Sequence, residues 1–234
     1  MTRTASTTRP LALTLALYAS CCGGAMAAEL SGSAALTTDY VWRGTSQSNE
    51  DPAVQAGLTI TSAHGFHAQI WGSSVQFAPD TRVATELDLV AGWSGAVTGE
   101  IALDISMTRY LYPSAVGSLD WTEASATLTW RDNYWVQIAR SSDALGSGAA
   151  GTYGQLGARI PLNAQVRLEG AAGRYRLAGA SGYEDYTHLQ LGAVWAVAAP
   201  FELRITLHDT DAAAMRGFGE WAGTRMEAAV QASF

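Results

Sequence analysis

Residues 201–208 read Phe-Glu-Leu-Arg-Ile-Thr-Leu-His, with apolar side chains at the odd positions and polar or charged ones at the even positions. Strict alternation puts the two kinds of side chain on opposite faces of a β-strand. The stretch therefore predicts a strand with one apolar face and one polar face.

The same alternation recurs along the chain after residue 28, and no stretch there shows a convincing helical repeat of 3.6 residues. Most segments reach the roughly nine residues that a tilted strand needs to cross a bilayer. Strands of globular proteins average nearer five or six. The twelve segments cover about residues 30–43, 53–62, 66–77, 82–93, 99–112, 121–130, 134–142, 152–160, 165–177, 185–197, 201–209 and 222–234.

The connections between the segments alternate in length. Residues 63–65, 131–133 and 198–200 form short turns, and longer Gly-, Ser- and Pro-rich loops such as 113–120 and 210–221 lie between them. Short turns at one end and long loops at the other are typical of outer-membrane barrels. We therefore expect an all-β fold, an antiparallel transmembrane β-barrel of twelve strands, with both termini at the short-turn, periplasmic end.

Aromatic residues on the apolar faces gather at the short-turn ends, which predicts a girdle at one membrane interface. The last segment carries apolar or small residues at alternate positions and ends on Phe234. We expect this strand to be recognised by the barrel-assembly machinery of the outer membrane. The girdle residues are Phe66, Trp93, Trp130, Tyr134, Trp195, Phe201 and Phe234.

The N-terminal residues predict a signal peptide over 1–27 and a mature barrel over 28–234. Arg3 and Arg9 form a basic region, residues 11–18 an apolar core, and Ala25-Met26-Ala27 a cleavage site. Both cysteines lie inside this segment, so the mature chain has no disulfide, thiol nucleophile or cysteine zinc site.

The charge argues against nucleic acid as a partner. The chain has no Lys, and its 14 Arg against 21 Asp and Glu leave a net charge of -7. Phosphate binding needs a basic surface.

Four runs resemble motifs of the TorF-type porin family of Gram-negative bacteria: DYVWRGTSQS at 39–48, GFHAQIWGSSV at 65–75, ELDLVAGWSG at 86–95 and YLYP at 110–113. Ser74 stands where the family usually has Asn, and Trp93 where it usually has Tyr. The motifs cover about residues 39–113. The resemblance implies a porin-like barrel in the cell outer membrane.

No motif of enzyme chemistry stands out, and we expect neither catalysis nor a cofactor or metal. The chain lacks Gly-x-Ser-x-Gly, a His-Glu-x-x-His motif and an Asp-rich calcium loop. His208 and Asp209 with Asp211, near the outer rim, leave open a rim hydrolase, since outer-membrane hydrolases place a His and a Ser or Asp there.

The polar faces carry the functional signal, because they line the lumen of such a barrel. Arginine–carboxylate pairs with glutamines either border a narrow pore or fill the barrel as a polar core, since twelve strands enclose a modest space. We expect a cation-preferring pore for small hydrophilic solutes or ions, with a non-conducting scaffold or adhesin as the alternative. The expected lining residues are Asp39, Glu86, Asp88, Glu100, Asp104, Glu123, Glu169, Glu202, Glu227, Arg43, Arg159, Arg167, Arg204 and Arg225.

Four arginines break the alternation by falling on the lipid-facing side: Arg109, Arg140, Arg174 and Arg176. Each lies near the long-loop end of its strand, where an outward Arg costs little. Lipopolysaccharide phosphates suit the planar guanidinium fork. We expect these arginines to contact lipopolysaccharide, unless a bulge at the rim turns one or two of them inward.

Overall fold

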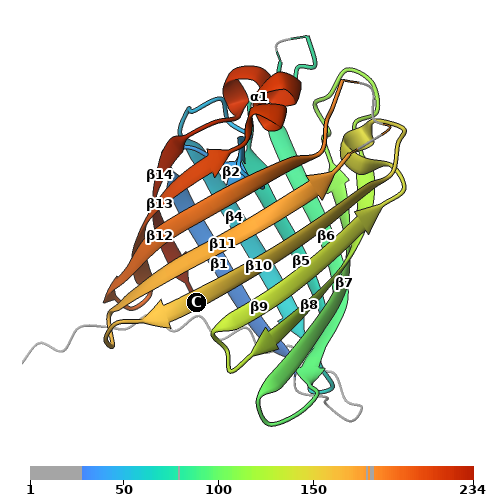
Figure 1. Cartoon of the computed structure of the whole chain (residues 1–234). Helices are drawn as coiled ribbons and strands as arrows, with labels where there is room; N and C mark the ends of the chain where they lie inside the picture. The colour runs from blue at the N-terminus through green and yellow to red at the C-terminus, as the bar shows by residue number, and fades with distance from the viewer. Residues whose placement is uncertain (1–27, 79, 178, 180–181) are drawn as a thin grey trace, which may run out of the picture.

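The computed structural model describes residues 28–78, 80–177, 179 and 182–234, and it contains a closed barrel of twelve antiparallel strands (Figure 1). Each strand pairs with the next along the chain, and β1 pairs with β14 to close the wall. The predicted fold class and strand number are confirmed. The barrel strands are β1 (Glu29–Thr37), β4 (Ala53–Thr61), β5 (Phe66–Ser74), β6 (Thr85–Ala96), β7 (Ile101–Leu111), β8 (Trp121–Trp130), β9 (Tyr134–Ser141), β10 (Gly151–Pro161), β11 (Val166–Arg176), β12 (Tyr186–Ala198), β13 (Phe201–Thr210) and β14 (Arg225–Ser233).

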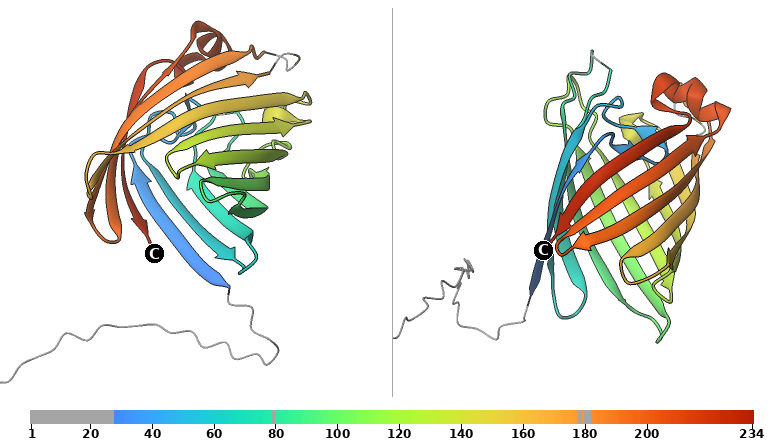
Figure 2. Two further views of the ribbon diagram at one scale, coloured as in Figure 1. Left: turned by 60° about the horizontal axis from the view of Figure 1, so that its bottom comes forward. Right: turned by 90° about the vertical axis from the view of Figure 1, so that its left-hand side faces the viewer.

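The two ends of the barrel differ as the sequence predicts. Connections of two to four residues join the strands at one end, called here the turn end. β1 begins and β14 ends at the same end. Connections of nine to fifteen residues lie at the other, called the loop end. Figure 2 shows the strands as one wall from two further directions.

The outside of the barrel is apolar. On β13, Phe201, Ile205 and Leu207 are each about half exposed, and comparable side chains of the other strands form a continuous surface with them. A contiguous apolar surface of this kind marks contact with a membrane or a partner. The aromatic residues expected in the girdle are exposed or half-exposed at the turn end.

None of the helices in the described part of the chain has the length and apolar character needed to cross a membrane.

The first strand is shorter than predicted. β1 ends at Thr37, and residues 38–52 fold back as a loop that contains a small hairpin of β2 (Val41–Trp42) and β3 (Thr45–Ser46). Two features turn the chain here: the Asp39 carboxylate accepts hydrogen bonds from the hydroxyls of Ser46 and Ser48, and Gly44 has φ +84°. The prediction of a strand over 30–43 was therefore wrong beyond residue 37.

A short helix lies in the last connection at the loop end, where no helix was expected. Helix α1 (Ala212–Phe218) begins after Asp211, whose carboxylate accepts from the amides of Ala213 and Ala214. A short turn of 3₁₀-helix, η2 (Gly219–Trp221), follows it. An aspartate in this position satisfies amides that the first helical turn leaves without partners.

The loop-end half of the barrel has a well-packed interior. Tyr153, Tyr175, Tyr186 and Leu177 are almost completely buried there, and α1 contributes Ala214 to the same cluster. Part of the interior at the loop end is therefore closely packed. The signal peptide expected over 1–27 lies outside the described residues and stays a prediction.

Candidate functional site

The middle of the barrel encloses a cavity of about 470 Å³, called here the central cavity. Its walls are mostly polar. They come from strands around the barrel and from the small hairpin of β2 and β3, called here the inward hairpin. Gln69, Gln137, Gln155 and Gln190 contribute amides, while Asp104 and Glu123 contribute carboxylates. A polar interior inside an apolar wall is the arrangement that a water-filled passage requires.

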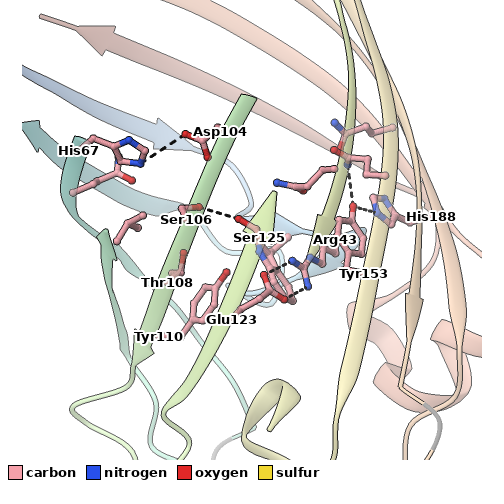
Figure 3. Close-up of a pocket in the computed structure, with 16 residues that line it drawn as sticks. Arg43, His67, Asp104, Ser106, Thr108, Tyr110, Glu123, Ser125, Tyr153 and His188 are labelled. Atoms are coloured by element: carbon pink, nitrogen blue, oxygen red, sulfur yellow. Dashed lines mark hydrogen bonds and ion pairs between the residues drawn. The ribbon is translucent and has the colours of Figure 1, made fainter. Parts of the chain in front are cut away.

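The inward hairpin closes the loop-end side of the central cavity through Arg43, which follows β2 (Figure 3). Its guanidinium reaches Glu123 on β8 through two hydrogen bonds of 2.9 and 2.6 Å. Both side chains are more than nine-tenths buried. The paired nitrogens and oxygens form the bidentate geometry that makes such contacts strong.

Aromatic rings surround the Arg43 guanidinium. Its central carbon lies 3.9 Å from the ring centroid of Tyr153, 4.2 Å from that of Trp42 and 4.8 Å from that of Tyr175. Burial alone would lower the pKa of Arg43, but the Glu123 carboxylate more than offsets this and holds the pKa above its usual value. Two hydrogen bonds and three aromatic rings therefore hold the Arg43 guanidinium in place on the loop-end side of the central cavity.

A stack of aromatic side chains continues this closure. Tyr110 and Trp121 stack with their centroids 4.2 Å apart, and Trp42 meets both edge-on at about 6 Å. Trp42 and Tyr110 line the central cavity on one side and a second, smaller pocket at the loop end on the other. Arg43, Glu123 and these rings are called here the constriction.

On the turn-end side, the lumen charges compensate one another. Arg167 makes a bidentate pair with Glu202 at 2.7 and 2.8 Å and also donates to Glu169. Glu169 accepts from Arg204 at 2.7 Å and from Arg159 at 3.3 Å. These five expected lining residues thus form one network of neighbouring strands.

A second cluster lies near the seam between β1 and β14. Arg225 lies 3.6 Å from Asp39 and donates to the carbonyls of Glu220 and Ala222. Glu227 accepts from Thr37 and pairs with His208 at 3.0 Å. Asp39 and Arg43 thus lie on the loop of residues 38–52 and not on a strand of the wall.

Two of the expected lumen acids lack a basic partner. Glu86 and Asp88 lie two residues apart on β6, and no ion pair with a basic side chain of the described residues is found for either. Within the described chain, Glu86 Oε2 and Asp88 Oδ1 also lack a hydrogen-bond partner. Asp104 is 3.8 Å from His67. Among the described lumen residues, the carboxyl groups that no arginine offsets are therefore few.

Glu100 is the exception among the expected lining residues. β6 extends to Ala96, so residues 97–100 form the turn before β7, and Glu100 lies in that turn. Its carboxylate pairs with Arg131 of the neighbouring turn at 2.8 Å, and both side chains are more than half exposed. The prediction that Glu100 lines the lumen is not met, because the turn begins and ends later than the alternation suggested.

In the described chain, the residues of the predicted rim site contact different partners. His208 faces Glu227, whereas Asp211 caps α1 and Asp209 accepts from Thr224. His188 lies 2.7 Å from the Tyr153 hydroxyl. Across the described ranges, no three or more His, Cys, Asp or Glu side chains come together as a metal site.

The four arginines that break the alternation point outward. All four are exposed on the outside of β7, β9 and β11, within two residues of the loop-end terminus of each strand. Arg109 lies 3.6 Å from Asp120, Arg140 donates to Thr152, and Arg174 lies 3.7 Å from Asp185. Arg176 is the last residue of β11.

The aromatic part of the constriction was not among the residues expected from the sequence. Tyr110, Trp121, Tyr153 and Tyr175 all occupy the inward phase of their strands, close to the loop ends. Aromatic residues at that phase and end are the signal that was available. Trp42 gave no such signal, because its position depends on the inward fold of the hairpin.

A closed twelve-stranded barrel, apolar outside and polar inside, with an aromatic girdle at its turn end, has the fold of the outer-membrane barrels. A family model described as "Bacterial protein of unknown function (Gcw_chp)" matches residues 22–234, and the chain belongs to this family. No curated protein sequence matches the chain.

Solved structures of porins share this fold. KdgM porin superposes with a TM-score of 0.55 at 9% identity, over 87% of this chain and 99% of KdgM. NanC porin superposes with a TM-score of 0.56 at 9% sequence identity, over 88% of this chain and 99% of NanC. The COG4313 outer membrane channel from Pseudomonas putida F1 superposes with a TM-score of 0.50 at 12% sequence identity, over 88% of this chain and 95% of that channel. These comparisons support a porin-like fold but do not support the TorF designation.

Proposed function

We propose that this protein is a narrow outer-membrane channel through which small hydrophilic solutes or ions pass without a cofactor. The observation that carries the proposal is the central cavity, which is polar and lies inside a barrel with an apolar exterior. Such a channel selects by its width and by the charges along its wall.

The wall charges favour cations. The arginines of the lumen are engaged with carboxylates, whereas Glu86 and Asp88 have no basic partner among the described residues. Uncompensated charge along a passage attracts ions of the opposite sign. The proposed channel therefore prefers cations to anions.

The constriction sets the permeability of the proposed channel. Arg43 and Glu123 close the lumen, and the small hairpin that carries Arg43 has only two pairs of bridged residues. Conduction of anything larger than a small ion requires the hairpin to move away from β8. If the hairpin stays in place and excludes small ions as well, the barrel is a non-conducting scaffold, which the packed cluster at the loop end favours as the second candidate.

We also propose that the loop end faces the outside of the cell and that the barrel-assembly machinery recognises β14. Phe234 is exposed, and its backbone exchanges hydrogen bonds with Gly32 at 2.7 and 3.0 Å where the barrel closes. The terminal aromatic therefore lies beside the seam that assembly must close.

Liposome swelling provides a direct test of solute passage. Vesicles containing the refolded protein should swell in small sugars or amino acids faster than empty vesicles, and the rate should fall steeply with solute size because the constriction is narrow. Vesicles containing the heat-denatured protein are the control. Swelling no faster than in empty vesicles for every solute would favour the scaffold.

The outward arginines are proposed to bind lipopolysaccharide phosphates. Replacing Arg109, Arg140, Arg174 and Arg176 together by Gln should lower the lipopolysaccharide that co-purifies with the protein, while the conductance stays unchanged. Replacing Arg131, at the turn end, by Gln is the matched control and should change neither. Unchanged lipopolysaccharide with altered conductance would place these side chains at the pore mouth.

A further inference from the structure

The loop end holds a second pocket, distinct from the central cavity and about 230 Å³ in volume. We call it the loop-end pocket. The inward hairpin forms its floor, and the connections of the loop end form its sides, including α1 and η2. Pockets that hold drug-sized ligands measure roughly 300–1,000 Å³. The occupant of this pocket is therefore smaller than a typical drug.

Aromatic side chains dominate the walls. Eight line the pocket among the described residues, and they come from segments that are distant in sequence. Trp42 and Trp121 belong to the constriction. The rings of Phe77 and Tyr112 pack with their centroids 5.4 Å apart, and Trp221 is the last residue of η2. Rings that converge in this way present several π faces to one small volume.

Glu86 is the single charged side chain among the described residues that line this pocket. It is 3% exposed, its Oε1 accepts from the Tyr112 hydroxyl at 3.3 Å, and its Oε2 has no hydrogen-bond partner within the described residues. A buried carboxylate oxygen without a partner is costly. No basic side chain of the described residues lines the pocket to offset it.

We propose that the loop-end pocket binds a small organic ammonium ion. The ring faces attract a cation through their quadrupoles, and quaternary ammonium groups are recognised by aromatic cages of this kind. Burial disfavours the ionised form of Glu86, and a cation bound beside it favours that form, so Glu86 supplies the opposite charge in the complex. An anion would meet Glu86 without a compensating base, and a hard metal ion would find one carboxylate where it needs several oxygen ligands.

The proposal goes beyond the channel and does not depend on conduction. Phe77, Tyr183 and Trp221 are only partly buried, so the pocket borders the exposed surface of the loop end. A ligand therefore reaches it from that side without crossing the constriction. Binding and conductance are measured separately, so the failure of one does not imply the failure of the other.

Calorimetric titration of the refolded full-length protein in detergent tests the site with choline and its neutral carbon analogue 3,3-dimethylbutan-1-ol. The two probes share their shape, and only choline carries a charge. Choline should bind saturably and about tenfold or more tightly than the neutral analogue, because a desolvated cation–π contact and the charge of Glu86 act together.

Variants locate the binding. Glu86→Gln should lower the affinity for choline by about tenfold or more and leave the affinity for the neutral analogue unchanged. Phe77→Leu should also weaken choline, because it removes one ring and keeps the site apolar. Glu100→Gln removes one acid at the turn end and should have no effect.

Two results overturn the proposal without any variant. The first is that the native protein does not bind choline. The second is that it binds choline and the neutral analogue with equal affinity. Unchanged choline affinity in a folded Glu86→Gln variant would overturn it as well. The comparison of the two probes on the native protein remains decisive if a variant does not fold.

Discussion

Replacing Glu123 by Leu is expected to destabilise the barrel by about 3–5 kcal/mol, because the change leaves the Arg43 cation buried without its partner. Arg43→Met should have a similar effect, since it leaves the Glu123 anion buried. Both side chains are more than nine-tenths buried, so water does not screen the loss. The double variant should recover much of the stability, because apolar side chains of similar volume replace a buried ion pair at little net cost.

Denaturant unfolding of the refolded protein in lipid vesicles, followed by tryptophan fluorescence, measures these differences. The pair of Arg131 and Glu100 is the matched control, since both side chains are more than half exposed. Arg131→Met should lower the free energy of unfolding by less than about 1 kcal/mol. Additive effects of the two constriction variants would show that Arg43 and Glu123 do not interact in the membrane-embedded protein.

Neutralising Glu86 and Asp88 together, as Glu86→Gln with Asp88→Asn, is expected to lower the ratio of cation to anion permeability several-fold. Neither carboxyl group has a basic partner among the described residues, so any charge on them is uncompensated. Clefts lined by one sign of charge concentrate counter-ions about tenfold or more, so removing that charge removes most of the preference.

The permeability ratio comes from reversal potentials in a salt gradient across planar bilayers. Glu100→Gln is the control, because Glu100 lies in a turn outside the lumen and pairs with Arg131. An unchanged ratio in the double variant would show that other acids, such as Asp104, set the selectivity.

Much of the barrel is predictable because strand periodicity is a local property. The alternation of 201–208 places Leu207 outside and His208 inside, and the structure shows exposed and buried side chains at these two positions. The apolar exterior and the aromatic girdle follow from the same rule, and the predicted strand number is correct.

The constriction was not predictable in this way, because it depends on contacts between distant residues. The sequence around Tyr40–Arg43 alternates as a strand does, yet the chain turns inward after Thr37. Arg43 then meets Glu123, 80 residues away. Alternation does not show whether a strand continues in the wall or folds into the lumen.

Helix α1 escaped prediction for a related reason. It has seven residues, too few for a clear repeat of 3.6 or for stability on its own. Its cap at Asp211 and the burial of Ala214 in the loop-end interior stabilise it. The cap is local, but the burial of Ala214 depends on the assembled barrel.

The reversal potential of the native protein in a tenfold gradient of potassium chloride across a planar bilayer tests the central claim most directly. The account predicts discrete channel currents of low conductance, because the Arg43–Glu123 pair narrows the lumen, with a reversal potential of the sign that favours potassium over chloride. A reversal potential that favours chloride, or the absence of any current from the folded barrel, would contradict it.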